Sequence, residues 1–277
     1  MHPAPMIVSE PAESPLTLAF HSFGRKGLPL VVLHGLFGQS RNWRSFARSF
    51  EEEFRVWTLD LRNHGDSPHA AEMDYPRMAG DVLQFIKDQC LDKAGILGHS
   101  MGGKTAMQLA LDHPRDVDFL VVADIAPVLY PHQDFHGKLI AALQKLPIDE
   151  YQSLSQFESA MEPDVPETHI RKFLLQNLKR EQGGFHWKLG LDEIAASLPK
   201  LLDAPKGKFN AYNGPTLFVG GSDSEYLHPK HHPLVRKIFP QNRIVMLKEA
   251  GHWLHVERAL TFQNTVRSFL NSILREK

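Results

Sequence analysis

Cysteine is nearly absent from this chain: Cys90 stands alone among 277 residues, so no disulfide can form within the chain. Disulfide-stapled secreted scaffolds are thereby excluded, and we expect a reducing, cytoplasmic location. The first 15 residues contain no Lys or Arg and show no basic start followed by an apolar run. A signal peptide is therefore not predicted.

Long apolar runs and an excess of charge of one sign are also missing. The best apolar runs have four or five residues, far short of the ~20 needed to span a bilayer. Lys and Arg total 31 against 32 Asp and Glu, and no segment concentrates basic residues, so a nucleic-acid partner has no electrostatic support. Hydrophobic residues make up 42% of the chain, which is enough for a sizeable core.

Short apolar strands alternate with helical patterns through the first half of the chain. Strands are predicted at residues 30–33, 55–59, 94–97 and 119–122. The helices between them are predicted at residues 43–50, 78–88 and 103–111. Strands are predicted again at 216–219 and 243–247, followed by a last amphipathic helix. Continuous apolar strands separated by helices indicate an α/β protein with a mostly parallel sheet covered on both faces.

The alternation is interrupted in the middle of the chain, where helical segments occur without a clear strand. The sequence therefore predicts a core of residues 1–128 and 211–277 and a helical cap of residues 129–210. An insertion at this place can cover the carboxyl edge of the sheet, where open α/β sheets bind ligands. The large apolar side chains available to line such a pocket are Phe135, Leu139, Phe157, Phe173 and Trp187.

The sequence G-H-S-M-G at residues 98–102 follows the strand predicted at 94–97 and precedes a predicted helix. The pattern G-x-S-x-G between a strand and a helix predicts a nucleophile elbow, a sharp turn that exposes the hydroxyl of Ser100. Glycines are needed because the turn is tight and neighbouring backbones approach closely. The start of the helix also favours a developing oxyanion.

The same stretch admits a second interpretation. Residues 98–105 fit G-x-x-x-x-G-K-[ST], the phosphate-binding loop of nucleotide hydrolases. Asp124, after the apolar run 119–123, resembles a magnesium-holding aspartate. That interpretation leaves the motifs at 34–38 and 251–253 without a role, so the acyl-transfer interpretation is favoured.

Acyl transfer requires an oxyanion hole and a base beside Ser100. The loop H-G-L-F-G at residues 34–38 follows a predicted strand, which assigns the backbone N–H groups of Leu36 and Met101 to the oxyanion. His252 follows the strand at 243–247, at the sheet edge where a serine needs a general base.

A third group must orient His252, and two aspartates are candidates. Asp124 and Asp223 each come just after a predicted strand, and both give the chain order Ser, Asp, His. The residues alone leave this choice open. No pattern in the sequence suggests a metal site.

Five segments together carry a family resemblance: residues 34–38, 60–67, 98–104, 124–128 and 251–255. With them the chain resembles the YbfF-type esterases of the α/β-hydrolase superfamily and their eukaryotic α/β-hydrolase-domain relatives. The resemblance implies hydrolysis of small-molecule esters with short or medium acyl chains, through an acyl-enzyme and without a metal or organic cofactor.

The resemblance also implies roles for single residues. It makes Ser100 the nucleophile and His252 the base, with Leu36 and Met101 as oxyanion donors, and it favours Asp124 over Asp223 as the acid. Thioester hydrolysis or cleavage of a carbon–carbon bond would use the same triad. A non-catalytic binding protein on this scaffold is a further alternative.

Overall fold

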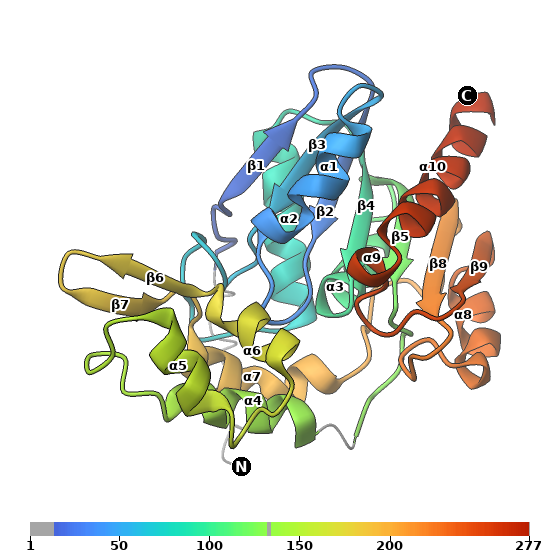
Figure 1. Cartoon of the computed structure of the whole chain (residues 1–277). Coiled ribbons are helices and arrows are strands. Elements are labelled where there is room, and N and C mark those ends of the chain that lie inside the picture. The colour runs from blue at the N-terminus through green and yellow to red at the C-terminus, as the bar shows by residue number, and fades with distance from the viewer. Residues whose placement is uncertain (1–13, 132–133, 277) are drawn as a thin grey trace, which may run out of the picture.

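A seven-stranded sheet forms the centre of the protein, for which the computed structural model describes residues 14–131 and 134–276 (Figure 1). The strand order is β1-β3-β2-β4-β5-β8-β9. β1 runs antiparallel to β3, and the remaining neighbours are parallel. The strands are β1 (Phe20–Phe23), β2 (Leu28–Leu33), β3 (Phe54–Leu59), β4 (Ala94–His99), β5 (Val117–Ala123), β8 (Thr216–Gly221) and β9 (Asn242–Leu247).

Helices cover both faces of this sheet, as the continuous apolar strands predict. Leu30 and Val32 pack with α1 (Arg44–Phe50) and α10 (Ala259–Glu276), whereas Val31 and Leu33 face the cluster that includes α2 and α3. The helices on this second face are α2 (Tyr75–Asp88), α3 (Met101–Asp112) and α8 (His232–Ile238). Three shorter helices are η1 (Ser40–Trp43), η2 (Pro229–His231) and α9 (Leu254–Glu257). The predicted α/β fold class is confirmed.

The register of the strands aligns the loops that follow them. Leu33 of β2 pairs with Gly98 of β4, and His99 of β4 pairs with Ala123 of β5. Ala123 in turn pairs with Val219 near the end of β8. The segments after β2, β4, β5 and β8 therefore leave the sheet at one edge, although they are far apart in the sequence.

The segment between β5 and β8 lies beyond this edge (Figure 1). It contains α4 (Asp134–Gln144), α5 (Leu154–Met161), α6 (Thr168–Leu175), β6 (Leu178–Glu181), β7 (Gly184–Trp187) and α7 (Leu191–Leu202). We call α4 to α7 the cap segment. The expectation of helices alone in it was wrong, because β6 and β7 form an antiparallel hairpin. Among the described residues, no helix combines the length and apolarity that a bilayer crossing requires.

Candidate active site

Ser100 occupies a strained turn between β4 and α3. Its backbone has φ 53° and ψ −116°, a conformation that L-residues rarely adopt. The turn is held by a hydrogen bond from the Ser100 N–H to the Ala123 carbonyl, 3.0 Å. A Cβ on Gly98 would come within 2.1 Å of the Gly102 carbonyl oxygen, and one on Gly102 within 2.5 Å of the Leu33 carbonyl oxygen. Close backbone packing therefore requires both glycines of the motif.

Asp124 and His252 meet beside this turn. The Nδ1 atom of His252 lies 2.8 Å from Oδ2 of Asp124, whose side chain is fully buried. The Gly221 N–H donates to Oδ1 over 3.0 Å, and the Ser224 hydroxyl donates to Oδ2. A carboxylate can only accept, so Nδ1 of His252 carries a proton, and in the neutral ring this leaves the lone pair on Nε2.

Asp223 takes a different position. Its side chain is exposed and accepts a hydrogen bond from the Ser222 hydroxyl, 2.9 Å, while its N–H donates to the Ala250 carbonyl. Of the two aspartates that follow strands at this edge, the structure brings Asp124 to His252 and leaves Asp223 at the surface.

The ring of His252 is held on two sides. Tyr226 stacks on it with 4.1 Å between ring centroids, and the ring of His99 lies 4.7 Å away. His99 also donates from Nε2 to the His252 carbonyl, 2.9 Å. Burial lowers the pKa of His99 well below its ordinary value of 6.5, so His99 stays neutral and adds no charge beside His252.

The two predicted oxyanion donors border the same small cavity as Ser100. The N–H of Met101 is the first of α3 and has no acceptor within the helix. For the Leu36 N–H, no acceptor occurs in the part of the chain that the structure describes. Both groups are therefore free to bind an oxyanion.

Two buried histidines hold the loop that carries Leu36. Nε2 of His64 accepts from the Phe37 N–H, 3.1 Å, and Nε2 of His34 accepts from the Leu61 N–H, 3.0 Å. Burial lowers the pKa of His64 to about 3, which keeps Nε2 a neutral acceptor. From the cap segment, Asn177 Nδ2 donates to the Phe37 carbonyl, 2.8 Å. The segment 60–67 thus positions the oxyanion loop, a role that its sequence alone did not predict.

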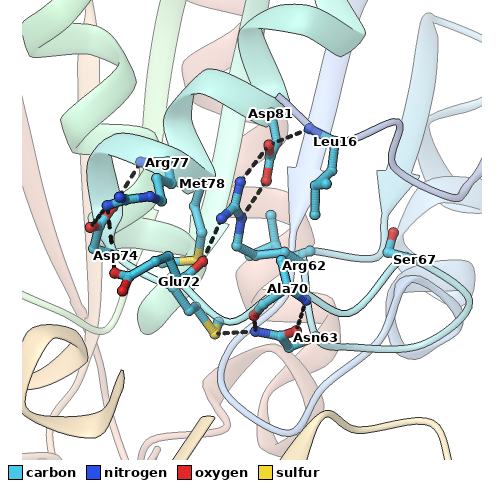
Figure 2. A network of polar contacts seen from close by, with 12 residues as sticks. Leu16, Arg62, Asn63, Ser67, Ala70, Glu72, Asp74, Arg77, Met78 and Asp81 are labelled. Atoms are coloured by element: carbon cyan, nitrogen blue, oxygen red, sulfur yellow. Dashed lines mark hydrogen bonds and ion pairs between the residues drawn. The ribbon is translucent and has the colours of Figure 1, made fainter. Parts of the chain in front are cut away.

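This segment is itself anchored on α2 by a buried ion pair (Figure 2). Nε and Nη2 of Arg62 lie 2.7 and 2.9 Å from the two carboxylate oxygens of Asp81, which also accepts from the Leu16 N–H, 2.8 Å. Next to it, Asn63 exchanges two hydrogen bonds with the backbone of Ala70, 3.0 and 2.7 Å. Since each of these polar side chains is satisfied, the segment forms a rigid support.

A cavity of about 210 Å³ opens beside Ser100 and His252. Of the five apolar residues singled out in the sequence, Phe135, Leu139 and Phe173 line it. Phe157 is instead buried against Phe185, and Trp187 borders a different surface hollow. The second cavity, about 30 Å³, also borders Ser100 and is lined by Met101 and Lys104.

Lys104 bears on the alternative of a phosphate-binding loop. Its Nζ donates to the carbonyls of Leu202 and Asp203, 3.0 and 2.6 Å, and lies 4.7 Å from the ring centroid of Tyr130. Burial lowers the pKa of Lys104 to about 7. The lysine therefore ties α3 to the end of α7 rather than facing a phosphate site. Within the described part of the chain, no cluster of three or more His, Cys, Asp or Glu residues is arranged to hold a metal ion.

Comparison with known proteins agrees with this geometry. Residues 29–259 match the family described as the alpha/beta hydrolase fold. The chain is 41% identical to the mouse sn-1-specific diacylglycerol lipase ABHD11 over 92% of its own length and 86% of the relative. It is 32% identical to the Escherichia coli esterase YbfF, covering 88% and 93% of the two chains.

A solved structure titled marine microorganism esterase is 39% identical and superimposes with a TM-score of 0.89, covering 92% of this chain and 99% of that one. The resemblance noted in the sequence is confirmed, and the chain belongs to the α/β-hydrolase fold family.

Proposed function

We propose that this protein is a serine carboxylesterase that hydrolyses small-molecule esters through an acyl-enzyme intermediate. The observation that carries the proposal is the 2.8 Å hydrogen bond between His252 Nδ1 and the buried Asp124 carboxylate, beside the turn of Ser100. Relatives that are named esterase or lipase support the same class of activity.

The reaction proceeds in two acyl transfers. Ser100 Oγ attacks the ester carbonyl carbon while its proton passes to Nε2 of His252. Asp124 holds His252 in the required tautomer, and the N–H groups of Leu36 and Met101 bind the oxyanion. The alcohol leaves with the proton from His252. Water then attacks the acyl-enzyme by the same route and releases the carboxylic acid.

Residues 129–210 form, in this proposal, a cap over a core of residues 1–128 and 211–277. The cap sets the range of substrates, because Phe135, Leu139 and Phe173 contribute apolar walls to the 210 Å³ cavity. Pockets for drug-sized ligands enclose roughly 300–1,000 Å³. The smaller cavity here favours short to medium acyl chains.

A substrate series with a serine variant tests the proposal. We expect the enzyme to hydrolyse p-nitrophenyl acetate, butyrate and octanoate, with the best kcat/KM at a short or medium chain. Dioctanoylglycerol belongs in the series because the mouse relative is named for diacylglycerol. Ser100→Ala should lower kcat by at least about 10⁴-fold. A fluorophosphonate should label the wild type at Ser100 and leave the variant unlabelled.

Other results point to the alternatives. Activity that survives in Ser100→Ala contradicts the proposed mechanism. Labelling of Ser100 without ester hydrolysis favours a thioester or a carbon–carbon bond as the substrate. A folded protein that neither hydrolyses esters nor reacts with the phosphonate favours a binding protein on this scaffold.

A further inference from the structure

His136, on the first turn of α4, occupies a position that the proposed mechanism does not use. It borders both the larger and the smaller cavity, as Ser100 does. Its ring centroid lies 6.4 Å from that of Phe37, next to the oxyanion loop. A polar side chain of the cap segment thus reaches the point where a bound ester must lie.

The ring of His136 makes no hydrogen bond with any residue that the structure describes. Nδ1 is buried from solvent and has no hydrogen-bond partner. Nε2 has no partner either, but it is not buried. By contrast, His34 and His64 engage both ring nitrogens in hydrogen bonds. Nδ1 of His255 is also buried without a hydrogen-bond partner, but the ring stacks on Trp43 with 4.4 Å between ring centroids. His255 borders the larger cavity and not the smaller one.

The protonation of His136 follows from these surroundings. Burial lowers its pKa to about 4, so the ring is neutral near pH 7 and carries one N–H. A buried N–H without an acceptor is rarer and more costly than an unfilled lone pair. The proton therefore resides on Nε2, the ring nitrogen that is not buried, so His136 offers a hydrogen-bond donor on a side chain that borders both cavities.

The part of the substrate that meets this donor is the alcohol part. His136 and His252 line the same cavity of about 210 Å³. In the proposed mechanism the leaving oxygen lies against Nε2 of His252. The alcohol part of a bound ester therefore lies in the cavity that His136 also borders.

We propose that His136 is a specificity-determining residue whose Nε2–H donates a hydrogen bond to a second oxygen in the alcohol part of the ester. The inference rests on the proposed esterase function. It predicts that the enzyme favours alcohols with an oxygen near the scissile bond over alcohols that are purely hydrocarbon.

A pair of esters that differ by one atom tests this inference. In 2-methoxyethyl butyrate an ether oxygen, which can only accept, replaces one methylene of butyl butyrate. The ratio of kcat/KM for the two esters should fall about tenfold in His136→Phe, the value of one hydrogen bond of about 1.4 kcal/mol. His136→Gln retains an N–H near the position of Nε2, so it should keep the ratio close to that of the wild type.

The half-buried His186 of β7 provides the control, because His186→Phe makes the same change outside both cavities. A ratio that His136→Phe leaves unchanged, in an enzyme that still hydrolyses butyl butyrate, overturns the inference alone. A ratio that His136→Gln lowers as much as His136→Phe overturns it as well, because a donor would then be irrelevant. A wild type that hydrolyses neither ester overturns the proposed function together with this inference.

Discussion

Ser100 and Asp124 both have a positive φ angle, which is unusual for residues with side chains. Their φ angles are 53° and 49°, and such residues cost about 1–3 kcal/mol each. Hydrogen bonds from neighbouring strand ends hold both: the Ser100 N–H donates to Ala123, and the Asp124 N–H donates to Val219 over 2.8 Å. The sheet thus imposes the turns that direct both side chains toward His252.

The choice between the two aspartates leads to a direct prediction. Asp124→Asn should lower kcat by about 10⁴-fold, because an amide no longer holds His252 in the tautomer that accepts the serine proton. Asp223→Asn alters an exposed side chain that bonds to Ser222, so kcat should stay within about a factor of two. Steady-state kinetics with p-nitrophenyl butyrate measures both.

The reverse pattern, a large loss in Asp223→Asn and a small one in Asp124→Asn, would reject the proposed triad. The residues alone could not make this choice, because both aspartates follow strands that end at one edge, and only the family resemblance favoured Asp124. The deciding fact is which carboxylate reaches His252, and that depends on the path of two loops. His136 was equally beyond prediction, since one of 16 histidines becomes notable only when its neighbours are known.

Among the elements, α3 has two roles, since it begins at the candidate nucleophile and also anchors the cap segment. One turn after Ser100, Lys104 binds the last carbonyls of α7, and the hydroxyl of Tyr75 on α2 donates to Leu201 in the same turn. A cation at a helix C-terminus is favoured by the helix dipole. The orientation of α7 is thereby linked to the turn that holds Ser100.

Removal of this link should weaken the fold. Lys104→Met keeps an unbranched apolar stem but leaves the carbonyls of Leu202 and Asp203 unpaired. We expect the free energy of unfolding in urea to fall by about 1.5–3 kcal/mol. Lys206→Met is the matched control, because Lys206 is exposed and its ion pair with Asp203 is worth at most about 1 kcal/mol. Equal losses in the two variants would mean that Lys104 does not anchor the cap.

The elements were predictable where the hydrophobic pattern was strong. The core strands and the helices between them follow from continuous apolar runs that are buried on both sides. The hairpin β6–β7 was missed because β6 is largely exposed and charged, so that it lacks an apolar face. Its turn is made possible by Gly183 and Gly184, with φ of 112° and 132°, and an isolated glycine pair is too weak a signal to reveal a strand. β1 was missed for the same reason, since it is mostly exposed.

The molecule as a whole contains several histidines that are neutral because they are buried. Burial lowers the pKa of His34, His64 and His99, that of His64 to about 3. In the unfolded chain these groups take up protons near pH 6.5. Between pH 6.5 and about 4 the unfolded state therefore binds more protons than the native state, and the native state loses stability as the pH falls.

Urea unfolding at a series of pH values between 7.5 and 5 checks this expectation. The free energy of unfolding should fall with pH, by up to about 1.4 kcal/mol per pH unit for each such histidine. His64→Gln removes one titrating group, whose pKa burial lowers to about 3, and should make the profile shallower. A flat profile for the wild type would show that the buried histidines accept protons without unfolding.

The alignment of the strand ends has a consequence for the newly made chain. Ser100 leaves the ribosome long before His252, and the backbone of Asp124 is held by Val219 of β8, which is made later still than the cap segment. A nascent chain that already contains the elbow sequence thus has neither a base for its serine nor the strand that fixes the acid. On the roles proposed for these residues, we expect reactivity toward esters to appear only after the last strands have docked, so that unfinished chains carry an unreactive serine.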